Sequence, residues 1–145
     1  MCGIAGFVDQ TLNNVQQQAG LNSMLQAIAH RGPNFRNTFF HQAVGLGHNR
    51  LSVIDLTSGG NQPKEFKDWV IVFNGEVYNY LELRSELQLL GYTFTSNSDT
   101  EVVLSAYDCW GKAAIQKMVG MWSMVIYNKK TQRLFVSRDR FGIKP

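Results

Sequence analysis

The chain begins Met1-Cys2-Gly3-Ile4-Ala5-Gly6-Phe7-Val8, a cysteine directly behind the initiator methionine followed by an apolar run. The run from Gly3 to Val8 is short and contains no charged residue, which predicts a buried strand. A strand that starts so early would hold Cys2 in a fixed place, whereas the end of a chain usually frays. The first eight residues therefore predict a sheet-forming N-terminus with a thiol at its head.

Outward from this strand, helical and strand-like segments follow without a regular β-α-β alternation, which favours an α+β fold over a doubly wound sheet. Helices are expected over residues 15–28, 79–90 and 98–107. Strands are expected over residues 38–41, 44–48, 51–54, 69–73, 121–127 and 133–137.

Three local signals refine these segments. Asn79 stands where it could cap the second helix, and Ser98 and Glu101 have capping-box spacing at the start of the third. Asn74-Gly75 follows a strand and has the sequence of a tight hairpin turn. The last two strands flank Asn128-Lys129-Lys130-Thr131, which predicts a second hairpin.

The bulk composition indicates one globular unit. The 145 residues are 44% apolar and 17% charged, enough for a single core and one domain over residues 1–145. No stretch reaches the roughly 20 uninterrupted apolar residues that cross a bilayer, and the N-terminus lacks a secretion signal. We therefore expect a cytoplasmic protein with no membrane partner. Two distant cysteines and three scattered histidines predict neither a disulfide framework nor a metal site.

The net charge of +3 comes from 14 basic and 11 acidic residues, too small a surplus to imply a polyanionic partner. Basic residues crowd the C-terminal end, where Asp139 is the only acid: Lys129, Lys130, Arg133, Arg138, Arg140 and Lys144. No aromatic or motif pattern for nucleic-acid binding accompanies them. We expect a solvated or partner-facing end and no nucleic-acid partner.

Cys2 is the most informative position for chemistry. Removal of Met1 would leave a thiol and a free α-amine on one residue, and α-amines titrate at about 7.7–8.0. Such an amine can act as a general base for the thiol, because the thiolate is the attacking species. The alternative is a small buried residue at the head of a strand, and position alone leaves both interpretations open.

Other candidate residues also have two interpretations each. Arg50 offers a planar fork for a carboxylate, although a lone arginine more often forms a surface ion pair. Asp99 could bind a substrate ammonium group or interact favourably with a helix dipole. Asn74 and Gly75 could form an oxyanion hole as well as a turn.

Seven segments, in chain order, resemble the class II glutamine amidotransferase domain, most of all the N-terminal domain of glutamine-hydrolysing asparagine synthetases. They are Met1 to Gly6, Arg31-Gly32-Pro33, His48 to Asp55, Asn61-Gln62-Pro63, Phe73 to Asn79, Ser98 to Glu101 and Arg138 to Pro145. The resemblance covers the chain from first residue to last. One departure is Asn34, where the family usually has aspartate, so a charge near the pocket mouth is absent.

The resemblance implies an N-terminal-nucleophile hydrolase fold, a four-layer α/β/β/α sandwich of two antiparallel sheets. It implies that Cys2 is the nucleophile and that Asn74 and Gly75 form the oxyanion hole. It also implies that Arg50 binds the α-carboxylate of glutamine and Asp99 its α-ammonium group. The rest of the glutamine pocket would consist of backbone groups of Leu51, Ser52, Val53, Ile54 and Glu76.

The implied reaction converts L-glutamine to glutamate and ammonia through a glutamyl thioester on Cys2. In proteins of this kind the ammonia passes to a C-terminal synthetase domain, where ATP and Mg²⁺ are expected; no cofactor is expected on this chain. Because the sequence stops at Pro145, we expect it to be a C-terminally truncated piece of a longer protein. Such a piece could be inactive or form a homodimer through exposed strand edges.

Two alternatives remain open. A domain that keeps Met1 would have its α-amine blocked and would serve only regulation or docking. An amidotransferase could also deliver ammonia to an acceptor other than aspartate, although Asn74-Gly75-Glu76-Val77-Tyr78-Asn79 favours the asparagine synthetase type.

Overall fold

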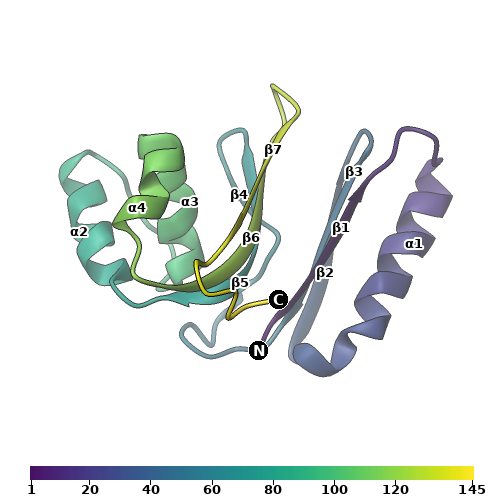
Figure 1. Ribbon diagram of the computed structural model, residues 1–145, viewed down its shortest axis with the longest axis horizontal. Helices are drawn as coiled ribbons and strands as arrows, with labels where there is room; N and C mark the ends of the chain where they lie inside the picture. The colour runs from purple at the N-terminus through teal and green to yellow at the C-terminus, as the bar shows by residue number, and fades with distance from the viewer.

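Two antiparallel sheets face each other, and helices cover their outer surfaces, in the computed structural model, which describes residues 1–145 (Figure 1). The first sheet has the strand order β1-β3-β2 and the second has the order β4-β5-β6-β7. The layers run from α1 through the two sheets to α2, α3 and α4 (Figure 1). This arrangement confirms the predicted α+β class with two antiparallel sheets between layers of helix.

The elements alternate irregularly along the chain. In order they are β1 (Gly3–Val8), α1 (Asn14–Ala27), η1 (Ala29–Arg31), β2 (Phe35–His41), β3 (Val44–Arg50), η2 (Ser58–Gly60), β4 (Lys64–Phe66), β5 (Trp69–Val77), α2 (Tyr80–Leu89), α3 (Asp99–Trp110), η3 (Gly111–Ala113), α4 (Ala114–Lys117), β6 (Gly120–Asn128) and β7 (Arg133–Arg138). None of the helices combines the length and the hydropathy that a membrane crossing requires.

Apolar side chains fill the space on both sides of each sheet. Leu21 and Leu25 of α1 are fully buried against the first sheet, and burial of each such side chain stabilises the fold by about 1.5–3 kcal/mol. Val44, Leu46, Val70, Val72 and Tyr127 form the cluster between the sheets. A larger cluster joins α2, α3 and α4 to β5 and β6. These cores fix the strands that carry the polar residues described below.

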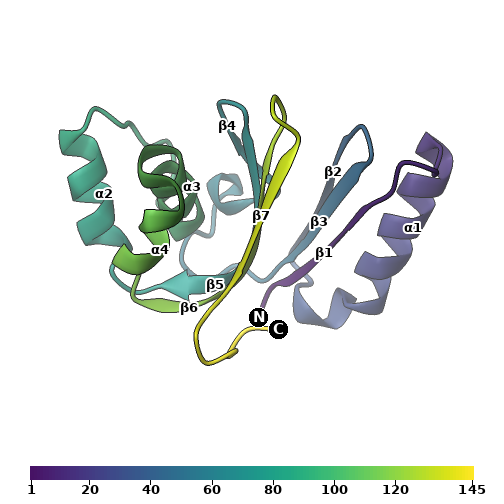
Figure 2. The ribbon, with the colours of Figure 1, turned by 45° about the horizontal axis from the view of Figure 1, so that its top comes forward.

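The two ends of the chain lie side by side where the sheets approach each other (Figures 1 and 2). The Lys144 ammonium nitrogen is 2.9 Å from the Met1 sulfur. Lys144 is only 5% exposed, so the expectation of a solvated or partner-facing basic end was wrong for this residue. Its loop is folded inward by Asp139, whose carboxylate accepts hydrogen bonds from the backbone N–H groups of Trp122, Phe141, Ile143 and Lys144.

Two predicted local structures are wrong. Residues 51–54 form no strand, because β3 ends at Arg50 and the next backbone N–H groups donate to side chains, Leu51 to Cys2 and Ser52 to Asn34. Asn74-Gly75 forms no turn, because β5 continues through it and pairs with Ser123 and Trp122 of β6. The chain reverses earlier, at Lys67, which has a positive φ of 53°.

The helix starts were predicted with mixed success. The Ser98 hydroxyl accepts a hydrogen bond from Thr100 N at 3.1 Å, which confirms the cap of α3, but Glu101 turns back to Thr95 and Ser96 and forms no capping box. Asn79 precedes α2 without capping it, because its side chain bonds to the α4–β6 connection. The predicted hairpin is confirmed, since β6 and β7 pair from Asn128↔Arg133 to Ser123↔Arg138.

Candidate functional site

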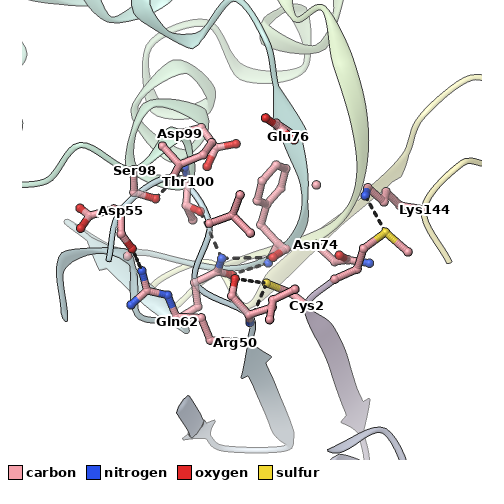
Figure 3. Close-up of a pocket in the computed structure, with 17 residues that line it drawn as sticks. Cys2, Arg50, Asp55, Gln62, Asn74, Glu76, Ser98, Asp99, Thr100 and Lys144 are labelled. Carbon is pink, nitrogen blue, oxygen red and sulfur yellow. Dashed lines mark hydrogen bonds between the residues drawn. The ribbon is translucent and has the colours of Figure 1, made fainter. Parts of the chain in front are cut away.

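A cavity of about 140 Å³ lies where the start of the chain, the end of β3, the second half of β5 and the first turn of α3 meet (Figure 3). Its lining residues are Met1, Cys2, Arg50, Leu51, Val53, Ile54, Asp55, Gly60, Gln62, Phe73, Asn74, Gly75, Glu76, Ser98, Asp99, Thr100 and Lys144. Every site residue predicted from the sequence is among them except Ser52. Residues almost a hundred positions apart are thus brought to one place.

Cys2 is held at the head of β1 by contacts on both sides of its residue. Its sulfur lies 3.4 Å from Leu51 N, which donates to it, and 3.6 Å from Leu51 O. The Arg31 Nε donates to Cys2 O at 3.0 Å. In this structure the nitrogen of Cys2 is part of the peptide bond to Met1, whose residue is 55% exposed at the cavity.

Arg50, the last residue of β3, is 6% exposed and has no carboxylate partner. Nη1 donates to Thr57 O at 2.6 Å and to the Asn61 side chain at 2.7 Å, and Nη2 donates to Asp55 O. The acceptors are neutral oxygens of the following loop, so they orient the guanidinium without neutralising its charge. The surface ion pair that a lone arginine often makes is therefore not observed.

The loop around Arg50 depends on a glycine. A Cβ at Gly60 would overlap the Arg50 guanidinium, because the backbone of η2 passes directly over it. We expect Gly60→Ala to displace Arg50 and to raise the KM for a carboxylate-bearing substrate by about 10- to 100-fold, as misplacement of a binding group does. Steady-state kinetics would measure this. Gly20→Ala in α1, where a Cβ meets nothing within 4 Å, is the control and should leave KM unchanged.

Asp99 is the first residue of α3 and is 5% exposed. Its Oδ2 accepts a hydrogen bond from Val77 N at 3.2 Å, and no cation pairs with it. Burial raises the pKa of Asp99 to about 6; the N–H groups of Val77 and Thr100 oppose the rise and the charge of Glu76 adds to it. The carboxylate is thus ionised at neutral pH but poorly solvated, a state that a bound cation would stabilise.

Asn74 lies beside Cys2. With its amide oriented to give both ends a partner, Nδ2 donates to Cys2 O at 3.1 Å and Oδ1 accepts from Arg31 Nη2 at 3.3 Å. Arg31 therefore contacts both Cys2 and Asn74. One N–H of Nδ2 is left for another acceptor. In Figure 3, Cys2 and Asn74 lie near the middle of the view, with Arg50 and Asp99 toward its left side.

The Gly75 N–H points away from β6. Tyr78 N donates to Val119 O, so alternate residues of β5 bond to β6, and Gly75 is not among them. Trp122, opposite Gly75, likewise donates its N–H elsewhere, to Asp139. No side chain accepts a hydrogen bond from Gly75 N, although it lines the cavity. A donor with no protein partner is thus directed into the same space as the Cys2 thiol.

Some site features were not predicted. Ser52 does not line the cavity, since its N–H donates to Asn34 Oδ1 at 3.0 Å. Asparagine at position 34 supplies this acceptor with its amide oxygen. Gln62, Asp55, Thr100 and Lys144 do line the cavity. Gln62 belonged to a recognised segment, Asn61-Gln62-Pro63, but its buried contacts depend on residues distant in sequence.

With this geometry described, comparison with known proteins gives the class of the chain. The model of the glutamine amidotransferase domain family matches residues 1–145, and the chain belongs to that family. The resemblance found in the sequence is confirmed.

Individual proteins of known name show which members of the family the chain resembles. The chain is 44% identical to the glutamine-hydrolyzing asparagine synthetase 1 of Bacillus subtilis, over 100% of the chain and 23% of that protein. It is 38% identical to the amidase chry2 of Gibberella zeae, over 99% of the chain and 23% of that protein. The chain thus spans about a quarter of the length of these relatives. The glutamine phosphoribosylpyrophosphate amidotransferase structure from B. subtilis shares the fold, with a TM-score of 0.79 at 17% identity over 99% of the chain and 38% of that protein.

Proposed function

We propose that this chain hydrolyses the side-chain amide of L-glutamine to glutamate and ammonia through a glutamyl thioester on Cys2. The observation that carries the proposal is a buried cation and a buried anion, Arg50 and Asp99, that form no ion pair yet line the cavity containing the thiol. Unpaired buried charges are costly, and a bound ligand that neutralises both offsets that cost. A free amino acid carries one group of each sign.

The first half of the proposed reaction forms the thioester. Once Met1 is removed, the α-amine of Cys2 takes the thiol proton and the thiolate attacks the side-chain carbonyl carbon of glutamine. The carbonyl oxygen becomes an oxyanion that accepts hydrogen bonds from Gly75 N–H and the free N–H of Asn74 Nδ2. The carbon–nitrogen bond then breaks, and the protonated α-amine gives its proton to the leaving nitrogen, which departs as ammonia.

The second half releases glutamate. Water attacks the thioester carbon while the α-amine takes its proton, and the carbon–sulfur bond breaks to return the thiolate. The nucleophile, base and oxyanion donors are all groups of this chain. The buried imidazole of His48 does not compete as a base, because it does not line the cavity and because burial, with a smaller contribution from the charge of Arg50, lowers its pKa to about 4.

The destination of the ammonia is a separate part of the proposal. We propose that residues 1–145 act as the glutaminase unit of a longer chain whose synthetase domain uses ATP to activate the acceptor. The named function of the B. subtilis relative supports aspartate as that acceptor. The Gibberella relative, named an amidase, supports a different chemistry on a similar domain, so a non-aspartate acceptor is the second candidate.

Processing of the N-terminus gives the direct test. Retention of Met1 converts the α-amine of Cys2 into an amide and lets Met1 occupy the cavity lining, which would suit a domain used only for docking. We therefore expect the chain with Cys2 at its terminus to release glutamate from glutamine and the Met1-containing chain to release none. Intact mass identifies each form, and a coupled glutamate assay measures the activity. Equal activity in both forms, or in neither, would contradict the proposal.

A further inference from the structure

The strand that should cover the open edge of β5 stops early. β4 pairs with β5 only at Trp69, Val70 and Ile71. Beyond that point, the N–H groups that face away from β6 belong to Phe73, Gly75 and Val77, and none has a backbone partner in a neighbouring strand. If β4 paired four residues further along β5, with Gly60 opposite Gly75, its carbonyl groups would take up the Gly75 N–H.

A side chain replaces the missing strand at the first of these positions. Gln62 is 4% exposed; its Oε1 accepts from Phe73 N at 2.6 Å and its Nε2 donates to Phe73 O at 3.1 Å. This pair of bonds reproduces what a neighbouring strand would give Phe73, and it ends there. The edge of β5 is therefore held in place up to the residue before Asn74, while Gly75 N–H stays open to the cavity.

The same side chain reaches the helix on the other side of the cavity. Gln62 Nε2 also donates to the Thr100 hydroxyl at 3.1 Å, and Thr100 is 3% exposed and directly follows Asp99 in α3. Asp99 contacts β5 on its own through Val77 N. One buried amide thus links the strand that carries the open N–H to the helix turn that carries the buried carboxylate.

We propose that Gln62 is a positioning residue for substrate selectivity: it fixes the spacing between the Gly75 N–H and Asp99, and so the length of amino acid whose side-chain amide meets Cys2. The inference rests on the proposed glutaminase function. Asparagine is one methylene shorter than glutamine, so an asparagine held by Arg50 and Asp99 has its amide carbon short of the thiol. If the distance between the Gly75 N–H and Asp99 is rigid, the site cannot contract to accept the shorter asparagine, and it selects glutamine.

Two variants distinguish the contacts of Gln62 with β5 from its contact with α3. Gln62→Met keeps the length and removes every hydrogen bond; we expect kcat/KM for glutamine to fall by about 10²-fold and the glutamine-to-asparagine ratio of kcat/KM by about 10-fold. Thr100→Val removes only the link to α3. It should raise KM for glutamine several-fold and lower the same ratio, with kcat within about 2-fold of the parent.

A matched control distinguishes positioning from general stability. Gln17 in α1 is another buried glutamine, 5% exposed, whose Nε2 donates to Leu12 O and Gln42 O away from the cavity. Gln17→Met should lower the melting temperature comparably and leave kcat, KM and the selectivity ratio unchanged. Assays use residues 2–145 with Cys2 at the terminus, and thermal melts accompany each variant.

The outcomes separate this inference from the function beneath it. A parent chain that hydrolyses no glutamine defeats the proposed function. A parent that is active, with the selectivity ratio unaltered in folded Gln62→Met and in Thr100→Val, overturns the role of Gln62. If Gln62→Met fails to fold, Thr100→Val alone tests the inference. A KM for glutamine and a glutamine-to-asparagine ratio of kcat/KM both equal to those of the parent would overturn it, and the expected shifts in both would support it.

Discussion

Replacing the Cys2 thiol abolishes glutamine hydrolysis: we expect Cys2→Ala, processed to the new terminal residue, to lose at least about 10³-fold in kcat. The expected loss is so large because the sulfur forms the covalent bond, and no other thiol lines the cavity. Binding should survive, since Arg50 and Asp99 are untouched. Calorimetric titration with glutamine alongside a glutamate-release assay measures both properties.

Cys109 provides the matched control for the first prediction. It is the other free thiol of the chain, lies in α3 and does not line the cavity. Cys109→Ala should retain parental activity, and a glutamine-like electrophile should label the peptide containing Cys2 and spare Cys109. Undiminished hydrolysis by Cys2→Ala would remove the thioester mechanism.

Asp99→Asn should stabilise the fold while removing glutamine binding. The buried carboxylate has its pKa raised from 3.8 to about 6, so its ionised form is disfavoured in the folded chain at neutral pH. Such a shift corresponds to about 2–3 kcal/mol of destabilisation above pH 6. An asparagine can still accept the Val77 N–H without carrying a charge. The substitution should remove only part of the destabilisation caused by the buried charge, so we expect the melting temperature at pH 7.5 to rise by about 3–8 °C.

The loss of binding in Asp99→Asn follows from the same burial. An α-ammonium group placed beside a neutral amide would be a buried charge without its partner, so KM for glutamine should rise by about 10²- to 10³-fold. In the parent chain, binding should also weaken as pH falls below about 6, where Asp99 becomes protonated.

The pH dependence of stability has a definite sign. A carboxyl whose pKa is raised by folding binds more protons in the folded state, so its contribution to the free energy of unfolding falls as pH rises from about 4 to about 6. The melting-temperature difference between Asp99→Asn and the parent should therefore widen as pH rises from about 4 to about 6, because the opposite contribution of His48, whose pKa burial lowers to about 4, is common to both proteins. Asp68→Asn, at an exposed acid, is the control and should change stability by less than about 0.5 kcal/mol. A melting-temperature difference between Asp99→Asn and the parent that stays constant from about pH 4 to about pH 6 would contradict the assignment.

Local sequence predicted much of this fold because several of its elements carry their signals within a few residues. β1 follows from the apolar run behind Cys2, α3 from the Ser98 cap, and the β6–β7 hairpin from the polar residues between two apolar strands. The residues expected around glutamine came from segment resemblance, and nearly all of them line one cavity.

The errors share one physical cause, competition between local and long-range contacts. Asn74-Gly75 has good turn residues, but β6 offers a complete partner strand, and pairing along all of β5 outweighs the local preference. The segment after Arg50 is apolar like a strand, yet its N–H groups contact side chains brought from Cys2 and Asn34. The contacts of Gln62 and the burial of Lys144 likewise depend on neighbours far along the chain.

The position of Met1 at the cavity mouth has a practical consequence for anyone purifying this protein. An affinity tag fused ahead of Met1 would enter beside the Lys144 side chain and lock the Cys2 nitrogen into an amide, leaving folded material with a capped amine. Tags belong after Pro145, or ahead of a protease site whose cleavage leaves cysteine as the first residue. Protein that keeps residues ahead of Cys2 would be folded in structural assays but would show no glutamine hydrolysis in a kinetic assay.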